Sequence, residues 1–240
     1  MTETLFRHPT SGRVNRSKRV DFEFNGKVYS GYEGDTLASA LLANGVFLTA
    51  RSFKYHRPRG IMGAGVEEPS CLVELLGENA AGNHAATIVR LRPGLAAKSV
   101  NCWPSPNFDL LSINQLFARF LPAGFYYKTF MWPASLWMTY EHVIRNAAGL
   151  GKVADDHNDP DRYEKTNAHC DVLIAGGGAS GLMAALQAGR SGARVMLADE
   201  QNEFGGWLLS ESDVEIDDAP VSTWIAKTVA TLAAMPEVTL

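Results

Sequence analysis

Cysteine is scarce in this chain, and its spacing excludes several classes of protein. Three cysteines, Cys71, Cys102 and Cys170, stand far apart in 240 residues, and no C-x-x-C pair occurs. An odd and scattered set does not make a disulfide framework, and a structural zinc site needs closely paired ligands. The sequence therefore indicates a reducing compartment, and we expect a cytoplasmic protein without a metal site.

Long apolar runs and a dominant charge are also missing. The most apolar stretch, residues 120–138, contains a lysine, two prolines and a glycine, which makes it a poor membrane-spanning helix. The formal net charge of −4 argues against a nucleic-acid-binding face, although residues 1–60 carry ten Lys/Arg against five Asp/Glu. We expect no nucleic-acid partner and no membrane association.

The first part of the chain has the pattern of a small α+β domain. VDFEF and KVYSGY alternate apolar and polar residues on either side of Asn25-Gly26, which predicts a β-hairpin. Asp35 is the expected N-cap of a helix over TLASALLA, and Asn44-Gly45 is its expected end. CLVELL (71–76) and ATIVRL (86–91) predict two further strands.

This order of elements resembles a [2Fe–2S] ferredoxin-like β-grasp domain. Such a cluster is held by four cysteines. At the plant-type spacing, the two loop positions that precede Cys71 hold Gly63 and Glu68. We therefore expect the scaffold without an Fe–S cluster, with Cys71 as a buried strand residue.

The loop over residues 51–70 is long for a compact domain, and long ordered loops are often functional. Its basic residues are Arg51, Lys54, His56, Arg57 and Arg59. They suit either contact with a phosphate or an acidic partner surface, or a plain solvated loop.

Residues 98–168 predict a helical connector that is rich in aromatic side chains. Eleven of the 23 aromatic residues lie between Trp103 and Tyr140, and they suit either a core between domains, which we favour, or a surface for other subunits. SINQLFARFL and SLWMTYEHVIRNAAGLG predict helices. The acid-rich segment 155–169 contains Pro160 and indicates a solvated linker rather than a metal cluster.

DVLIAGGGASGLMAALQAGRSGARVMLADE (171–200) carries the strongest functional signal. Gly176, Gly178 and Gly181 form G-x-G-x-x-G between a predicted strand and a predicted helix. The first glycine permits the tight turn, the second leaves room for a pyrophosphate, and the third allows close helix–strand packing. The backbone N–H groups of Ala179, Ser180 and Gly181 are expected to face the phosphates.

A second predicted strand leads to Asp199 and Glu200, and an acid at this point binds a ribose hydroxyl. An acid also repels a 2′-phosphate, so the pattern favours NAD or FAD over NADP. FGGWLL follows, where Gly206 is expected to help close the loop and Trp207 suits either the nucleotide or the core, with a lean towards the core. One further helix, over VSTWIAKTVATLAAM, and the start of a strand come after it. We therefore interpret the chain as a fragment whose Rossmann-type domain is cut short at residue 240.

The predicted fold class is α+β followed by α/β. The expected parts are a basic N-terminal arm, the ferredoxin-like domain, the connector and the first part of an FAD/NAD(P)-binding domain, over residues 1–19, 20–97, 98–168 and 169–240.

RSFKYHRPRG, PAGFYYKTFMWP and HCDVLIAGGGASGL, in this order, resemble the α subunit of heterotetrameric sarcosine oxidase. The resemblance implies a cytoplasmic flavoprotein complex that demethylates sarcosine oxidatively to glycine. Its products are hydrogen peroxide and either formaldehyde or methylene-tetrahydrofolate. It also implies partner β, γ and δ subunits, with FAD and FMN in the β subunit.

For this chain the resemblance implies NAD, with FAD as the alternative, and no catalytic residues. The implied cofactor-binding residues are Gly176, Gly178, Ala179, Ser180, Gly181, Asp199, Glu200, Gln201, Gly206 and Trp207. The residues leave open a second function, an FAD-binding subunit of a related amine dehydrogenase acting on dimethylglycine or proline. They also leave open a pure interaction module.

Overall fold

The computed structural model describes residues 6–77, 81–121, 123–124, 131–147 and 164–240. They divide into two compact units. The first unit falls within residues 1–7, 13–63 and 67–161, and the second within 8–12, 64–66 and 162–240. Each unit has its own hydrophobic core.

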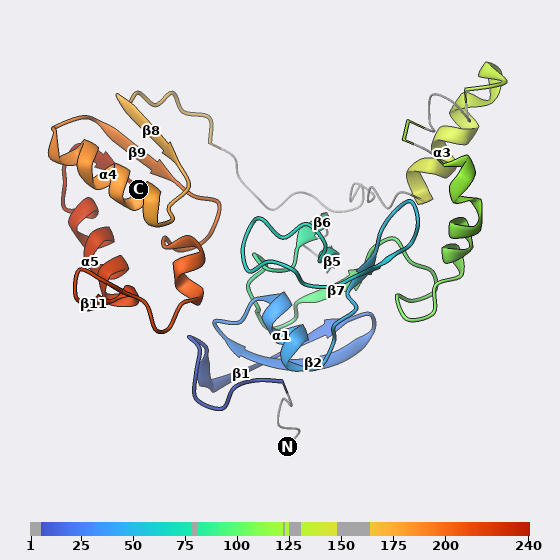
Figure 1. The fold of residues 1–240 in the computed structure, drawn as a ribbon, viewed down its shortest axis with the longest axis horizontal. Helices are drawn as coiled ribbons and strands as arrows, with labels where there is room; N and C mark the ends of the chain where they lie inside the picture. The colour runs from blue at the N-terminus through green and yellow to red at the C-terminus, as the bar shows by residue number, and fades with distance from the viewer. Residues whose placement is uncertain (1–5, 78–80, 122, 125–130, 148–163) are drawn as a thin grey trace. The chain divides into compact units, whose positions relative to one another are not determined.

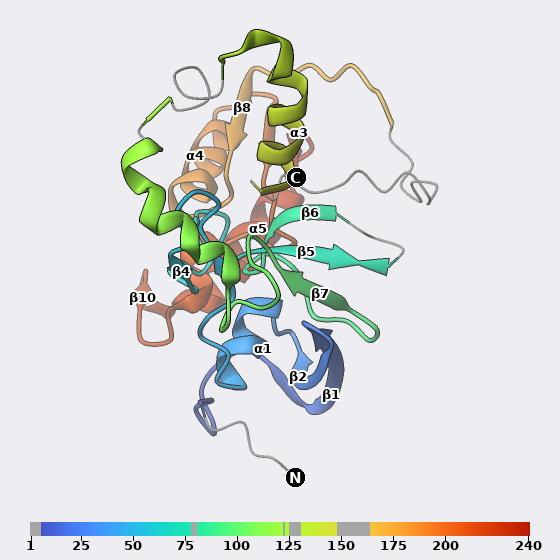
Figure 2. The same ribbon diagram turned by 90° about the vertical axis from the view of Figure 1, so that its right-hand side faces the viewer.

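The first unit contains a mixed five-stranded sheet with the order β2-β1-β7-β5-β6. The strands are β1 (Asn15–Phe24), β2 (Lys27–Glu33), β5 (Leu72–Leu76), β6 (Ala81–Ala85) and β7 (Ala96–Ser99). β1 runs antiparallel to β2 and parallel to β7, whereas β5 is antiparallel to both of its neighbours. Figure 2 shows β5, β6 and β7 side by side. This mixed sheet with its helix fits the expected α+β class.

The predicted hairpin is present. β1 and β2 are joined by Asn25 and Gly26, with φ values of 52° and 75°, as a tight type I′ turn requires. Val20, Phe22 and Phe24 alternate along β1 and are buried in the core of the first unit. The period of two in the sequence therefore fixes which face of β1 is covered.

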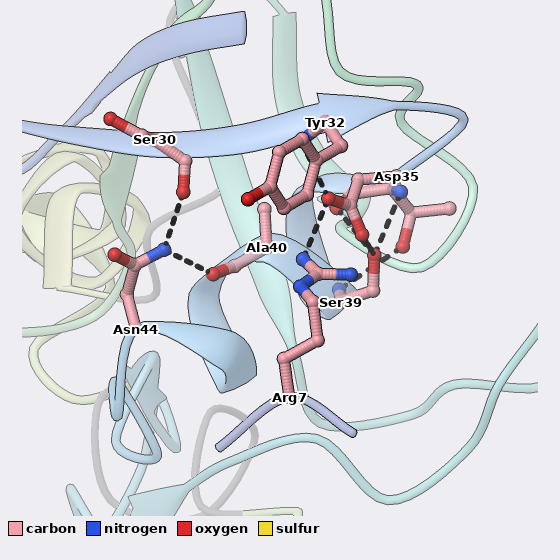
Figure 3. Close-up of polar contacts among 8 residues, drawn as sticks. Arg7, Ser30, Tyr32, Asp35, Ser39, Ala40 and Asn44 are labelled. Carbon is pink, nitrogen blue, oxygen red and sulfur yellow. Dashed lines mark hydrogen bonds and ion pairs between the residues drawn. The ribbon is translucent and has the colours of Figure 1, made fainter. Parts of the chain in front are cut away.

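Helix α1 (Leu37–Ala43) packs on this core, but its N-cap differs from the prediction. Thr36, rather than Asp35, is the N-cap and forms a reciprocal capping box with Ser39. Asp35 lies one residue earlier and accepts hydrogen bonds from the Tyr32 backbone N–H at 2.8 Å and the Ser39 hydroxyl at 2.7 Å. The guanidinium of Arg7 pairs with the same carboxylate at 2.7 Å, so the N-terminal arm is anchored beside α1 (Figure 3).

The strand predicted over 86–91 is wrong. Its carbonyls instead accept the first backbone N–H groups of α1, from Leu37 to Val89 at 2.8 Å and from Ala38 to Ala86 at 3.0 Å. These N–H groups have no partner inside the helix, so a turn that presents carbonyls to them stabilises the helix start. β6 and β7 lie on either side of this turn in the sequence.

The rest of the first unit consists of short elements. β3 (Ala50–Arg51) pairs with β4 (Pro58–Arg59), and further along lie the 3₁₀ helices η2 (Leu110–Phe120) and η3 (Ala134–Leu136) and helix α3 (Trp137–Ala147). Both predicted helical segments are therefore helical, although the first is 3₁₀. Residues 125–130 and 155–161 lie outside the described residues.

Several aromatic residues of this region lie at the surface of the described structure. Trp103, Phe108, Phe117 and Trp132 are between 52% and 85% exposed. Trp103 and Phe108 precede η2, Phe117 lies in it, and Trp132 precedes η3. The interpretation of these residues as a core between the domains stays a prediction.

The second unit contains three parallel strands in the order β12-β9-β8: β8 (Val172–Ala175), β9 (Val195–Ala198) and β12 (Val238–Thr239). Helix α4 (Ala179–Arg190) lies across β8 and β9, with α5 (Val221–Ala233) beside it (Figure 1). The short helix η4 (Gly206–Ser210) precedes a two-stranded hairpin of β10 (Glu215–Ile216) and β11 (Ala219–Pro220). None of the helices described in either unit combines the length and apolar character needed to cross a bilayer.

Candidate functional site

The glycine motif forms a tight turn from β8 into α4. Gly176 has φ +99°, a conformation that L side chains rarely adopt, and Gly178 is the N-cap of α4. The Gly176 N–H donates to the Ala198 carbonyl at 2.7 Å, which ties the turn to the end of β9. Because β8 and β9 are parallel neighbours, their carboxyl ends meet at this turn.

The three motif glycines differ in what a side chain would meet. A Cβ at Gly181 would overlap the carbonyl oxygen of Gly176, so this glycine is required for close helix–strand packing. A Cβ at Gly176 or Gly178 would meet no described atom within 4 Å. The first two glycines therefore border open space at the start of α4, where a helix N-terminus favours an anion.

Asp199 follows β9 and joins this turn directly. Its carboxylate accepts hydrogen bonds from the backbone N–H of Gly177 at 2.5 Å and of Gln201 at 2.7 Å. Asp199 is neither fully buried nor fully exposed, and its carboxylate lies beside the glycine turn. Glu200 is exposed at the next position.

A second loop closes against the glycine turn. The Gly205 N–H donates to the Gly177 carbonyl at 2.8 Å, and a Cβ at Gly206 would come within 3.1 Å of the Gly178 Cα. Gly205 and Gly206 both have positive φ, at +129° and +55°. Trp207 is 65% exposed, so the lean towards a core position is wrong.

The structure thus brings most of the predicted residues to one place. The glycine turn, the first turn of α4, Asp199 and Gly206 adjoin one another, and this group includes Gly176, Gly178, Ala179, Ser180, Gly181 and Gln201. Sequence reasoning missed Gly177, Phe204 and Gly205. The Phe204 ring packs where a Gly177 side chain would stand, so the available signals were the middle glycine of the GGG run and the F-G-G that follows β9.

Two other polar arrangements lie in the first unit. The buried Glu68 carboxylate accepts four backbone N–H groups, from Met62, Gly63, Ser70 and Cys71, at 2.5–2.9 Å. Burial raises the pKa of Glu68, but these four donors lower it, and the net pKa lies below its ordinary value.

The second arrangement is a buried pair between His56 and Asp109. The His56 Nδ1 lies 2.8 Å from the Asp109 carboxylate, and both side chains are fully buried. Asp109 also accepts the N–H groups of Trp103 and Leu111 and caps η2. The pair therefore fixes the basic loop against the start of η2.

Two known protein families match separate regions of the chain. A family described as "2Fe-2S iron-sulfur cluster binding domain" matches residues 17–102, and one described as "FAD dependent oxidoreductase" matches residues 171–232. A crystal structure of L-proline dehydrogenase from P. horikoshii matches 94% of this chain and 33% of its own, with a TM-score of 0.53 and 19% identity. That likeness concerns the fold alone.

Curated relatives match nearly the whole chain. Sarcosine oxidase subunit alpha of Rhizobium meliloti (strain 1021) is 54% identical over 235 residues, and that of Corynebacterium sp. (strain U-96) is 36% identical over 227. The match covers 97% and 95% of this chain but only 24% and 19% of those proteins, so the chain spans about a quarter of their length or less. The resemblance to sarcosine oxidase subunit alpha, and with it to subunits of an oxidoreductase, is confirmed.

The family matches overturn the expected cofactors. The expectation of no Fe–S cluster is wrong against a match to a 2Fe–2S cluster-binding family, and the expectation of NAD is wrong against a match to an FAD-dependent family. Loss of motif cysteines did not remove the domain from its family. The NAD choice followed from the resemblance alone, since the acid after β9 suits FAD equally.

The cysteines of the matched region are too few to hold a [2Fe–2S] cluster. A [2Fe–2S] cluster takes four cysteine thiolates, whereas residues 17–102 contain Cys71 and Cys102. Burial raises the pKa of both thiols to about 11. Among the residues that the structure describes, no three of His, Cys, Asp or Glu group as metal ligands. This ligand set does not fit the cluster, and no functional step is assigned to one.

Proposed function

We propose, from the kinship with sarcosine oxidase alpha subunits, that this chain supplies an FAD-binding region to a multi-subunit amine oxidase. The observation that carries the proposal is the open space bordered by Gly176 and Gly178, beside the carboxylate of Asp199. A diphosphate needs bare backbone and a helix N-terminus, and an adenosine ribose needs a carboxylate one strand away. All three features meet at the ends of β8 and β9.

The residues fit the adenosine diphosphate half of FAD. Backbone N–H groups at Ala179, Ser180 and Gly181 start α4 and would hold the diphosphate, while Asp199 would accept a ribose hydroxyl. Glu200, Gln201, Gly206 and the exposed Trp207 would border the adenosine. When bound, FAD would accept the two electrons released as an amine is oxidised to an imine. The chain's own residues would bind and orient it and exclude the 2′-phosphate of NADP by charge.

The proposed reaction is that of the whole complex. Sarcosine, O₂ and H₂O give glycine, formaldehyde and H₂O₂, or the one-carbon unit passes to tetrahydrofolate as its methylene derivative. The relatives' name, subunit alpha, supports the presence of other subunits. We propose a heterotetramer with β, γ and δ subunits and FMN at their interface, and no catalytic residue in this chain.

The finer division of the chain belongs to the same proposal. A basic arm (1–19), a β-grasp domain (20–97), a connector (98–168) and the first part of a Rossmann-type domain (169–240) are supported by the sheet orders β2-β1-β7-β5-β6 and β12-β9-β8. A cytoplasmic location is supported by three free cysteines.

The proposal is tested by identifying the nucleotide that the purified protein carries. Acid denaturation followed by chromatography and mass spectrometry of the supernatant should yield FAD, in a ratio to protein that falls sharply in Gly178→Ala. Ala184→Ser, at an exposed position of α4, is the matched control and should retain it. A protein that releases no dinucleotide, and takes up none when FAD is added, would overturn the proposal.

A further inference from the structure

The basic loop of the first unit borders a pocket that the proposed function does not use. It has a volume of about 260 Å³ and is formed by residues of β3, β4 and the turn between them, together with residues 69, 70, 72, 100 and 101. Four cationic side chains line it, from Arg51, Lys54, Arg57 and Arg59. The short β3–β4 pairing is what brings them together, since it folds Arg51 back beside Pro58.

The charge of this pocket is strongly one-sided. Its lining, as far as the structure describes it, contains no carboxylate against the four cations. The acids in neighbouring segments are Glu67, Glu68 and Asp109. Glu68 and Asp109 are buried and already accept hydrogen bonds from backbone N–H groups, and Asp109 also holds His56. Even if all three acids are counted against the pocket, one positive charge remains. A concave, positive site concentrates small anions.

Three of the four cations, from Arg51, Lys54 and Arg57, have contacts within the first unit before any ligand arrives. Arg51 donates to the carbonyls of Pro106 at 2.8 Å and His56 at 2.9 Å, neutral partners that leave its charge uncompensated. The guanidinium of Arg57 and the ammonium of Lys54 lie 5.2 and 4.8 Å from the centre of the Tyr55 ring. The Tyr55 hydroxyl in turn donates to the Leu121 carbonyl at 3.0 Å. Side chains that are already ordered lose less entropy on binding.

A second observation points to a ligand that also carries a hydrogen-bond donor. Asn101 lines the same pocket, and its side-chain oxygen is buried with no hydrogen-bond partner among the described residues. An amide oxygen accepts hydrogen bonds, so a hydroxyl group on the ligand would satisfy it.

We propose that this pocket binds a small phosphate monoester, with Arg57 and Arg59 as the principal ligands of the phosphate. A planar guanidinium group binds two phosphate oxygens through two parallel N–H···O hydrogen bonds. A phosphate can make this bidentate contact with two arginines, whereas a monocarboxylate can make it with one. The volume suits a phosphate with a small organic group and is below the range typical of larger ligands. The site lies wholly within the first unit, so it is independent of the proposed dinucleotide site.

The test is calorimetric titration of the purified full chain with inorganic phosphate and with glycerol 3-phosphate, at fixed ionic strength. Both are expected to bind, and R57A/R59A is expected to weaken binding by about tenfold or more, the loss of one charge-assisted contact or greater. Arg92→Ala removes an exposed arginine outside the pocket and should leave binding unchanged. Asn101→Asp, which adds a negative charge to the lining, should weaken it.

Three outcomes would overturn the proposal. Phosphate binding that R57A/R59A leaves intact would place the anion elsewhere in the chain. Succinate binding as tightly as glycerol 3-phosphate would remove the preference for phosphate. A wild-type chain that binds neither phosphate, while R57A/R59A loses a co-purifying partner subunit, would assign the pocket to an acidic protein surface instead.

Discussion

The backbone N–H of Gly177 donates to the carboxylate of Asp199 at 2.5 Å, across the ends of two neighbouring parallel strands. The bond makes the acid part of the glycine turn rather than a separate residue that waits for a ribose. Asp199 therefore holds the turn through Gly177, and under the proposed function it has a second role, to accept a ribose hydroxyl.

Asp199→Asn tests whether the charge of Asp199 contributes to dinucleotide binding. An amide keeps the size of the side chain but loses the charge that strengthens the bond to Gly177 and to a ribose hydroxyl. We expect dinucleotide affinity to fall by about tenfold, or ~1.4 kcal/mol, measured by fluorescence titration of the apoprotein with FAD. Glu200→Gln changes an exposed neighbour and should have a smaller effect. Equal effects of the two variants would contradict a specific role for Asp199.

Gly178→Ala and Gly181→Ala should fail in different ways. Gly178 has φ −70° and open space around its Cβ position, so alanine should cost less than about 1 kcal/mol of folding free energy. The same methyl group would occupy the space proposed for the diphosphate and abolish FAD binding. At Gly181 the Cβ would overlap the Gly176 carbonyl, with an expected loss of about 2–3 kcal/mol of stability.

Thermal unfolding and FAD titration of both glycine variants check this contrast. Gly178→Ala should melt close to the wild-type temperature without the ligand, whereas Gly181→Ala should melt well below it. If Gly178→Ala binds FAD normally, the diphosphate does not lie over the second glycine.

Cys71 should resist alkylation in the folded protein. Its side chain is fully buried, and burial raises the pKa of the thiol to about 11, so almost no thiolate exists near pH 8. Cys170 is only half-buried and should react first with iodoacetamide. Peptide mapping of the labelled protein, with and without denaturant, checks this order. Labelling of Cys71 before Cys170 in the folded protein would contradict it.

The fold could be predicted from the sequence where a local pattern and the tertiary structure favour the same conformation. The β1–β2 hairpin has alternating burial and an Asn25-Gly26 turn, and both signals lie close together in the sequence. The segment 86–91 has the same apolar character, but its backbone satisfies the start of α1 through Ala86 and Val89. A sequence pattern does not reveal that a distant helix needs these carbonyls.

The glycine motif of the candidate site could be predicted for a similar reason. The contacts that could not be predicted also have a physical explanation. The G-x-G-x-x-G spacing predicts the roles of Gly176, Gly178 and Gly181, because each position in the turn has its own steric requirement. The contact of Phe204 with Gly177 joins two loops 27 positions apart, and the GGG and F-G-G sequences mark the two loops without showing that they meet. The pocket at Arg57 and Arg59 likewise depends on Asn101, which only the folded chain brings beside them.

Glu68→Gln should destabilise the first unit in a way that depends on pH. The carboxylate accepts four backbone N–H groups, whereas the amide has one oxygen and directs an NH₂ donor at some of the same N–H groups, at a cost of about 2–4 kcal/mol near neutral pH. The folded-state pKa of Glu68 lies below its ordinary value of 4.5, so its stabilisation is fully present above that value and is lost as the pH falls through the folded-state pKa. Denaturant unfolding of both proteins from neutral to acidic pH should therefore show a gap that narrows below pH 4.5. Glu23→Gln, at an exposed position of β1, should show no such gap, and a Glu68→Gln gap that stays constant down to the most acidic pH would mean that the charge of the carboxylate is not what the four N–H groups require.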